Sequence, residues 1–487
     1  MDNDIRNLLP EVVWNNFADL NAVPRPSKKE ERVIAFMLDF GQGLGLETLR
    51  DEVGNVIIRK PATSGMENRK TVTLQSHLDM VHQKNNDTVF DFDKQGILME
   101  VDGDWVKARG TTLGADNGMG VAAIMSLLQS KDIPHPPLEA LFTIDEETGM
   151  TGAKGLKGGV LQGEILLNLD TEEDDEIDIG CAGGIDITAK GNYEIKTPNP
   201  DHKTYRIKIK GLQGGHSGMD IHKGLGNANK IMNRLLFSSF TEFSIALAQL
   251  KGGGLRNAIP RESTAVITVP KEKDDAFKKK LQEWSEEISQ EYKPIEQGLT
   301  IRIEETEIPD AVMESEAFEN LIKAVYSAHN GVYRMSPAIA DLVETSNNIA
   351  NITVDSGQIQ MGCLTRSSVE SSKMDLANAL KSAFELGGYD VTFSGSYPGW
   401  SPNPDSEILK LLERLYKQIF REEPKVVACH AGLECGILGQ HYPKMDMISF
   451  GPTIHGAHSP DERVSISSVQ KFWKYLQEIL LHIPEKA

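Results

Sequence analysis

Three short, mostly apolar segments that end on histidine or carboxylate side chains constrain the fold of this chain more than any other feature. They cover residues 71–76, 141–144 and 164–169, and they are rich in aliphatic or β-branched residues, as buried strands are. The side chains that follow them are His77 with Asp79, Glu146 with Glu147, and Asp170. Because ligands gather outside the carboxyl ends of the strands in open α/β sheets, this pattern predicts an α/β fold with a polar site at that edge.

The adjacent carboxylates Glu146 and Glu147 indicate hydrolytic chemistry. One carboxylate can bind a metal ion while its neighbour moves protons, and metal-assisted hydrolysis needs both functions. Taken alone, such a pair is more often an exposed acidic turn. The other strand ends favour the functional interpretation.

A histidine and a carboxylate two residues apart follow the first segment. Residues two apart in a strand share a face, so His77 can bind a cation through one ring nitrogen while Asp79 accepts a hydrogen bond from the other. An exposed histidine near an aspartate is the alternative interpretation of this spacing. We expect the acidic run 172–176 to be a water-facing loop without a functional role.

A third carboxylate, Asp116, lies among glycines just before the apolar stretch 121–128. Glycines let the backbone come close to a site, so Asp116 can reach inward, and its two oxygens could bridge two cations. A simple turn or helix cap would also explain an Asp-Asn-Gly sequence. Near the C-terminus, the loop 451–462 contains two further candidates, His455 and His458.

Taken together, these motifs resemble those of the M20 metallopeptidases, and within them the Xaa-His dipeptidases, over essentially the whole chain. The motifs are HLDM (77–80), GADNG (114–118), DEETG (145–149), NLD (168–170), GGHSG (214–218), RNAIPRE (256–262), HAGLECG (430–436) and GAHSPDE (456–462).

The resemblance implies a two-metal site in each subunit. Its ligands would be His77, Asp116 as the bridging carboxylate, Glu147, Asp170 and His458. It implies Asp79 as the carboxylate that orients His77, and Glu146 as the general base. Because His458 precedes Ser-Pro-Asp-Glu, the family motif selects it over His455. Histidine with carboxylates favours zinc (Zn2+), while Co2+ and Mn2+ accept the same ligands.

The resemblance also implies contacts with a dipeptide substrate. Asn257 would donate to the scissile carbonyl, and Arg366 would pair with the terminal carboxylate. His216 would stabilise the developing oxyanion from the partner subunit of a homodimer. Glu434 would bind the free amino group, although a structural role for this residue is equally compatible with the sequence.

The length of 487 residues exceeds what one hydrophobic core usually supports, so two domains are expected. Since His458 lies far from the other presumed ligands in sequence, the catalytic domain must be discontinuous. We expect a zinc-peptidase catalytic domain over 1–185 and 391–487, with an α+β lid/dimerisation domain inserted over 186–390.

Several local patterns predict individual elements. We expect a helix that opens with a capping box at Ser27–Glu30, a hairpin over 48–60 that turns at Gly54–Asn55, and an amphipathic helix over 274–292.

The charge balance argues against nucleic acid or an anionic membrane surface as a partner, because the net charge is -20 and the pI is near 5.1. The N-terminus lacks a secretory signal pattern, and no stretch resembles a membrane span. Four scattered cysteines fit reduced thiols. We therefore expect a cytoplasmic protein.

The sequence thus predicts a metallo-dipeptidase that hydrolyses unblocked dipeptides and prefers a C-terminal histidine. One alternative is an M20-type deacylase of N-acyl amino acids, which would not need the amine-binding Glu434. The other is a metal- or peptide-binding protein without turnover, against which the free base Glu146 counts.

Overall fold

The computed structural model describes residues 2–486, which divide into two compact units. The first unit contains the described residues up to Gly180, Trp400–Ala428 and those from Leu433 onward. The second unit contains Cys181–Gly399 and Cys429–Gly432. Within the described residues, no helix has both the length and the apolar character that a membrane crossing requires.

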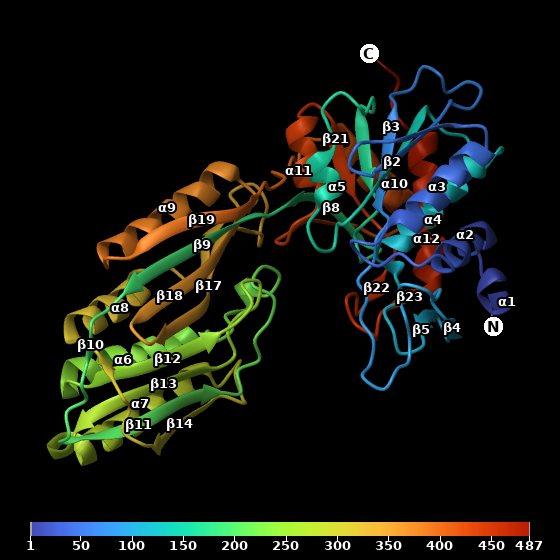
Figure 1. The fold of residues 1–487 in the computed structure, drawn as a ribbon. Helices are drawn as coiled ribbons and strands as arrows, with labels where there is room; N and C mark the ends of the chain where they lie inside the picture. The colour runs from blue at the N-terminus through green and yellow to red at the C-terminus, as the bar shows by residue number, and fades with distance from the viewer. Residues whose placement is uncertain (1, 487) are drawn as a thin grey trace. The chain divides into compact units, whose positions relative to one another are not determined.

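The first unit is built on an eight-stranded sheet (Figure 1). Its strands, in spatial order, are β1 (Glu47–Arg50), β2 (Val56–Lys60), β6 (Leu138–Thr143), β3 (Val72–His77), β7 (Ile165–Asn168), β21 (Asp446–Ser449), β8 (Glu176–Cys181) and β20 (Lys425–Cys429). Strands β6, β3, β7 and β21 are parallel to their neighbours within this central group, whereas β1, β2 and β8 pair antiparallel. The expected α/β fold is confirmed.

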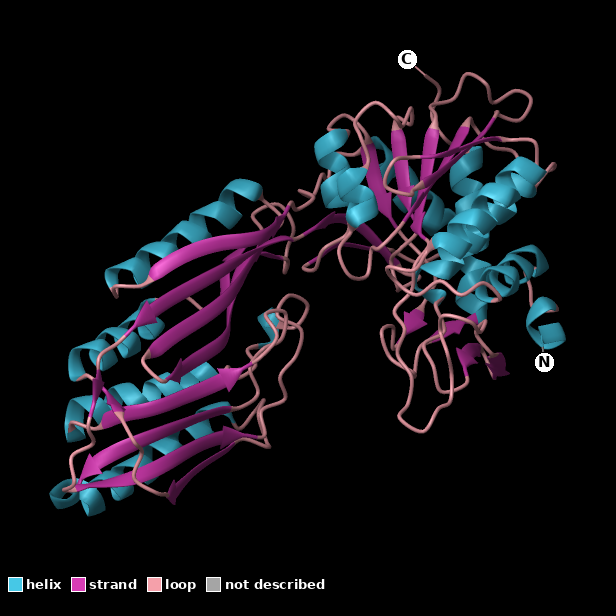
Figure 2. Ribbon diagram, in the orientation of Figure 1, coloured by secondary structure: helices cyan, strands magenta, loops and turns pink. Residues whose placement is uncertain are grey.

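Helices pack against both faces of this sheet (Figure 2). Helices α5 and α11 share a hydrophobic core with one face, whereas α3, α4 and α10 contact β2, β3 and β21. The helices of the unit are α1 (Asp2–Arg6), α2 (Glu11–Asn21), α3 (Glu31–Gly43), α4 (Ala115–Gln129), α5 (Thr151–Gly155), α10 (Glu407–Phe420), α11 (Glu434–His441) and α12 (Ile466–Leu481). A small antiparallel sheet contains β22 (Ile454–His455), β23 (Arg463–Ser465), β5 (Trp105–Ala108) and β4 (Met99–Asp102).

The second unit is an antiparallel sheet packed against four helices (Figure 1). The strands of its main path are β14 (Thr300–Glu305), β11 (His202–Lys210), β13 (Ser263–Pro270), β12 (Ala246–Gly253), β17 (Val343–Asp355), β18 (Gln358–Ser367), β9 (Gly183–Asn192) and β19 (Asp390–Tyr397), and β16 (Gly331–Met335) pairs with β17. A separate pair joins β10 (Ile195–Lys196) to β15 (Val312–Met313). The helices are α6 (Ala228–Phe243), α7 (Asp274–Tyr292), α8 (Ser315–Ser327) and α9 (Glu370–Leu386), with short 3-10 turns η1 (Ile221–Lys223) and η2 (Lys271–Lys273). One continuous hydrophobic core lies between these helices and the sheet.

The local predictions have mixed outcomes. The hairpin of β1 and β2 and the helix α7 are confirmed. The capping box at Ser27 is wrong. Helix α3 begins at Glu31 without a side-chain cap, because the hydroxyl of Ser27 donates instead to Asp79 Oδ2 at 2.8 Å. The chain returns to the first unit at Trp400 rather than after residue 390, because β19 pairs with β9 in the second unit.

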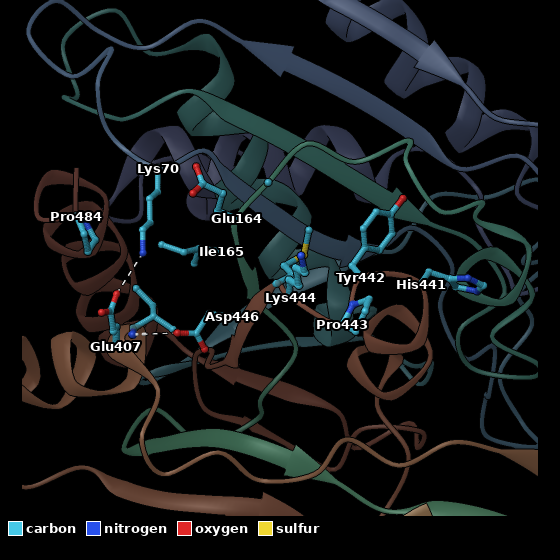
Figure 3. Close-up of a pocket in the computed structure, with 13 residues that line it drawn as sticks. Lys70, Glu164, Ile165, Glu407, His441, Tyr442, Pro443, Lys444, Asp446 and Pro484 are labelled. Carbon is cyan, nitrogen blue, oxygen red and sulfur yellow. Dashed lines mark hydrogen bonds and ion pairs between the residues drawn. The ribbon is translucent and has the colours of Figure 1, made fainter. Parts of the chain in front are cut away.

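A cavity of about 640 Å³ opens at the amino end of the parallel strands (Figure 3). Its lining includes Ile165 and Asp446, the first residues of β7 and β21. Lys70 and Glu407, which form an ion pair at 3.2 Å, are also among its lining residues. The predicted ligands follow the opposite ends of the strands, so this cavity is separate from them.

Candidate metal centre

Neighbouring strands of the first unit present the predicted ligands at a single edge. Strand β3 ends at His77, and β7 ends at Asn168, two residues before Asp170. Strand β6 lies on the other side of β3, parallel to it, and leads into the Glu146–Glu147 turn. Because all three strands run in the same direction, residues from separate parts of the chain meet outside their carboxyl ends.

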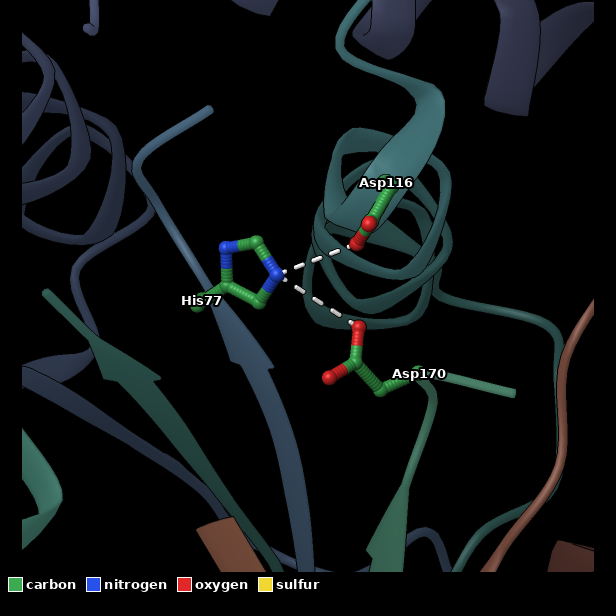
Figure 4. Close-up of side chains that lie close together, drawn as sticks. All are labelled: His77, Asp116 and Asp170. Carbon is green, nitrogen blue, oxygen red and sulfur yellow. Dashed lines mark hydrogen bonds and ion pairs between the residues drawn. The ribbon is translucent and has the colours of Figure 1, made fainter. Parts of the chain in front are cut away.

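The first ligand group contains His77, Asp116 and Asp170 (Figure 4). His77 Nε2 lies 3.1 Å from Asp116 Oδ1 and 3.5 Å from Asp170 Oδ1. The side chain of His77 is almost fully buried. Asn117, whose peptide bond to Asp116 is cis, donates a hydrogen bond to Asp170 and to the carbonyl of Leu169.

The second ligand group, which shares Asp116 with the first, contains Asp116, Glu147 and His458; a third candidate group contains His77, Glu146 and Glu147. His458 Nε2 lies 3.3 Å from Asp116 Oδ2 and 3.0 Å from Glu147 Oε2. Asp116 therefore belongs to both groups, with one oxygen facing His77 and the other facing His458. This is the arrangement expected of a carboxylate that bridges two cations.

Asp79 supports both His77 and the carboxylate turn. His77 Nδ1 is 3.1 Å from the carbonyl oxygen of Asp79 and 3.5 Å from its carboxylate. Since a carbonyl only accepts, Nδ1 must carry a hydrogen. Nε2 is then the ring nitrogen that faces Asp116 and Asp170, and it would offer its lone pair to a cation bound there. The carboxylate of Asp79 also accepts from the backbone N–H groups of Glu146 and Glu147 at 3.0 and 3.3 Å.

Burial and hydrogen bonding shift the pKa values of the groups in this centre in opposite directions. Burial raises the pKa of Glu146 well above its usual value, and burial also raises that of Glu147. Hydrogen bonds to Asp116 and Glu147 raise the pKa of His458 to about 11. Burial opposes the ionisation of Asp116, but hydrogen bonds from His458 and His77 outweigh it and keep the Asp116 pKa low.

The residues of the centre fit a pair of divalent cations. Two imidazoles and several carboxylates converge, with ligand atoms of each group within 4.8 Å of one another. Glu147 Oε1 is buried and accepts no hydrogen bond from the described residues. A buried carboxylate oxygen without a partner is costly, and a bound cation would satisfy it.

The predicted substrate contacts His216, Arg366 and Asn257 lie in the second unit. Arg366 Nη2 is 3.4 Å from His216 Nε2, and Arg366 Nη1 donates to Tyr397 Oη at 2.7 Å. The carbonyl oxygen of Asn257 accepts from Ser217 N at 2.8 Å, and this bond joins the loop of Asn257 to the loop of His216. These three candidates therefore cluster within one unit.

Glu434 lies in the first unit, at the start of α11, and is completely buried. Its Oε2 accepts from Gln75 Nε2 at 2.6 Å and from Thr143 Oγ1 at 2.5 Å. Its Oε1 is buried with no hydrogen-bond partner among the described residues, and burial raises its pKa to about 8.

Three residues that contact the ligand-bearing loops were not identified from the sequence. Ser27 bonds Asp79, Arg25 bonds backbone carbonyls near His77, and Glu462 bonds backbone N–H groups near Asp116. Only Glu462 lies in a quoted motif. The buried positions of Arg25 and Ser27 depend on contacts distant in sequence, which local patterns do not reveal.

The prediction that the acidic run 172–176 is a water-facing loop is wrong. All five side chains are partly buried, and burial raises the pKa of Glu172 to about 8. Lys471 and Lys425 pair with Asp174 and Asp175 at 3.2 and 2.9 Å. The run therefore packs against the first unit through ion pairs.

Comparison with known proteins gives consistent results. Residues 73–482 match the model of peptidase family M20/M25/M40. The chain is 43% identical to the cytosol non-specific dipeptidase of Escherichia coli over 99% of this chain and 100% of that protein. The structure matches aminoacylhistidine dipeptidase from Vibrio alginolyticus with a TM-score of 0.93 and 44% identity over 99% of both chains.

A more distant match shows the shared fold alone. Aminopeptidase PepT from Bacillus cereus ATCC 10987 superposes with a TM-score of 0.57 at 16% identity, over 97% of this chain and 98% of that one. The family match spans most of the sequence and includes the loops that carry all the predicted metal ligands. This chain belongs to peptidase family M20/M25/M40.

Proposed function

We propose that this protein is a metal-dependent dipeptidase that hydrolyses unblocked dipeptides and prefers a C-terminal histidine. The observation that carries the proposal is the pair of ligand groups that share Asp116 beside Glu146, a partly buried carboxylate with a raised pKa. The names of the two similar proteins, a non-specific dipeptidase and an aminoacylhistidine dipeptidase, support the substrate class.

We assign His77, Asp116, Glu147, Asp170 and His458 as the ligands of two metal ions, with zinc favoured by the mixture of imidazole and carboxylate donors. When bound, such ions would acidify a water molecule and polarise the scissile carbonyl. The distances of Asp116 to both histidines support its role as the bridge.

Glu146 is assigned as the general base and acid. It takes a proton from the attacking water and gives a proton to the amine that leaves when the peptide C–N bond breaks. Burial raises its pKa well above the usual value, and a raised pKa makes a carboxylate a stronger base. Asp79 holds the tautomer of His77 and the backbone of the Glu146–Glu147 turn.

Arg366 and His216 are assigned to the negatively charged groups of the substrate. His216 Nδ1 accepts from the backbone N–H groups of Gly218 and Met219 at 3.3 and 3.1 Å, so Nε2 of the neutral ring carries the hydrogen. Two donors, Nε2–H and the Arg366 guanidinium, then lie side by side. In addition, Arg366 Nε is buried without a hydrogen-bond partner among the described residues, which supports an anionic ligand here.

Two further contacts complete the proposed recognition of a free dipeptide. The side chain of Asn257 is exposed beside the His216 loop, and we assign it to the scissile carbonyl. The unpartnered Oε1 of Glu434 supports a role for this carboxylate in binding the free amino group. Simultaneous pairing of the substrate's carboxylate with Arg366 and of its amino group with Glu434 would restrict the substrates to dipeptides.

We further propose a division of labour between the two units. The discontinuous first unit would be the catalytic domain, and the inserted second unit would serve as lid and dimerisation domain that supplies His216 to a partner subunit. We also propose a cytoplasmic location, which the word cytosol in the name of the E. coli relative supports.

Hydrolysis of a substrate panel by the metal-loaded protein tests this function. We expect cleavage of free dipeptides, fastest for those ending in histidine, and negligible cleavage of their N-acetylated forms. The Glu434→Gln variant should lose activity on free dipeptides while activity on N-acyl amino acids, if present, stays unchanged. Preferential hydrolysis of N-acyl amino acids would identify the protein as a deacylase, and absence of turnover on all substrates would identify a binding protein.

A further inference from the structure

Glu462 holds the loop that carries the bridging carboxylate through an unusual number of backbone contacts. Its Oε2 accepts from the N–H groups of Leu113 and Gly114 at 2.6 and 2.9 Å. Its Oε1 accepts from Ala115 and Asp116 at 2.7 and 3.2 Å. The side chain is 2% exposed, so these four bonds form away from water.

The backbone that Glu462 holds cannot be fixed by helical hydrogen bonding alone. Helix α4 begins at Ala115, but Asp116 and Asn117 have non-helical backbone angles. The first N–H groups of a helix also have no partner within it. Glu462 supplies acceptors to these N–H groups and so fixes the backbone position from which the side chain of Asp116 extends.

Arg25 holds the opposite side of the same loop. Its Nη2 donates to the carbonyl of Gly114 at 2.6 Å, while Glu462 accepts from the N–H of Gly114. Its Nη1 donates to the carbonyls of Leu78 and Asp79 at 3.1 and 3.3 Å, next to His77. The guanidinium is buried. Its positive charge interacts favourably with the negative charge of the Glu462 carboxylate.

These contacts connect three ligand-bearing segments. Arg25 joins the segment of His77 to that of Asp116, and Glu462 joins the segment of Asp116 to that of His458. Glu462 lies four residues after His458 and directly before β23, whose pairing with β5 anchors this end of the loop.

We propose that Arg25 and Glu462 are positioning residues that preset the spacing of His77, Asp116 and His458 for the metal pair. The proposal rests on the ligand assignment made above. The positioning proposal goes beyond the ligand assignment, because it attributes part of the metal affinity to two side chains that do not bind the metal. Groups that orient metal ligands typically contribute about 10 to 100-fold to affinity.

Titration of the full-length, metal-stripped protein with Co2+ tests the proposal without any substrate. We expect Glu462→Gln to weaken Co2+ binding by about 10 to 100-fold and to change the d–d absorption spectrum of the bound ion, because the ligand geometry shifts. Glu462→Asp retains the charge but shortens the reach, so it should weaken binding similarly. The exposed neighbour variant Asp461→Asn should stay within about twofold of wild type, as surface substitutions usually do.

The variants separate positioning from simple charge attraction. Wild-type affinity and spectrum in Glu462→Asp, with weak binding only in Glu462→Gln, would overturn the proposal in favour of an electrostatic effect. Circular dichroism of the metal-free proteins verifies folding, and Glu462→Asp or Arg25→Lys decides the outcome if Glu462→Gln does not fold. Arg25→Lys keeps the charge but loses the fork of donors, so weaker Co2+ binding is expected there too.

Asp116→Ala separates failure of this proposal from failure of the ligand assignment. If Asp116→Ala loses Co2+ while the Glu462 and Arg25 variants bind like wild type, only the positioning role is wrong. If Asp116→Ala itself binds two Co2+ ions like wild type, the proposed metal site is wrong.

Discussion

At the scale of single residues, our proposal gives two adjacent carboxylates different roles. Glu147 is 3.0 Å from His458 and belongs to a ligand group that includes Asp116. Glu146 is partly buried, and its pKa is raised well above the usual value. Burial raises both pKa values, so the proposed division into ligand and base rests on position, with Glu147 beside His458 and Asp116.

Glu146→Gln removes the proposed base but preserves the shape of the side chain. We expect kcat to fall by about 10² to 10⁴-fold while both metal ions remain bound, because the ligands are unchanged. Steady-state kinetics and metal analysis of the purified variant measure the two quantities. A variant that contains fewer ions than wild type would instead place Glu146 among the ligands.

Arg366→Lys keeps a positive charge but loses the planar fork that matches a carboxylate. We expect KM for free dipeptides to rise by about 10-fold, on the scale of one charge-assisted hydrogen bond. C-terminally amidated dipeptides, already poor substrates, should be hydrolysed at an unchanged rate. Comparison of kcat/KM for matched free and amidated peptides provides the measurement, and equal losses for both would show that Arg366 does not recognise the carboxylate.

At the scale of secondary structure, the parallel direction of β6, β3 and β7 assembles the site. The strands are buried along their length, so the polar residues that follow them emerge together at one edge. Helix ends contribute in the same way. Helix α4 begins beside Asp116, and α11 begins at Glu434.

Helix α6 of the second unit depends on its cap at Asn227. The side chain accepts from the N–H groups of Asn229 and Lys230 at 3.0 and 3.2 Å, and its amide donates to the carbonyl of Ile349 at 3.1 Å. We expect Asn227→Ala to lower stability by about 1 to 3 kcal/mol, because it removes the cap and the amide hydrogen bonds to Asn330 and Ile349, while Ile349 keeps its bond from Asn229.

Hydrogen exchange of the α6 amides, together with the thermal midpoint, measures this loss. Asn227→Ser is the matched control, because it keeps a capping oxygen but removes the amide donor to Asn330 and Ile349. We expect it to lie between wild type and Asn227→Ala. Protection of α6 equal to wild type in Asn227→Ala would mean that tertiary packing alone maintains the helix.

At the scale of the whole molecule, the candidate residues are divided between the two units. The metal ligands, Glu146 and Glu434 lie in the first, whereas His216, Asn257 and Arg366 lie in the second. Our proposal that His216 serves the metal centre of a partner subunit makes catalysis depend on a dimer.

Mixing two inactive variants tests this dependence. His216→Ala and Glu146→Gln should each be nearly inactive alone, yet a mixed dimer contains one site with both wild-type residues. Random exchange makes about half of the dimers mixed, each with one intact site of two, so roughly a quarter of wild-type activity should return. Pull-down of a tagged subunit verifies exchange, and exchange without recovered activity would rule out the shared site.

Residue types and their spacing were enough to predict the α/β fold and the kind of chemistry, because alternating or apolar runs and their polar ends are local properties of a chain. The hairpin of β1 and β2 and helix α7 were predictable for the same reason. The candidate ligands could be named because their motifs are short and contiguous, although the motifs carry no distances between them.

Only the tertiary structure revealed which side chains support those ligands. Ser27 seemed to cap a helix but bonds Asp79, and Arg25 and Glu462 hold loops that are distant from them in sequence. Likewise, β19 belongs to the second unit because of its pairing with β9, which its own sequence does not specify. Buried polar groups take partners wherever folding brings a donor to an acceptor, so these contacts depend on the assembled fold rather than on local sequence.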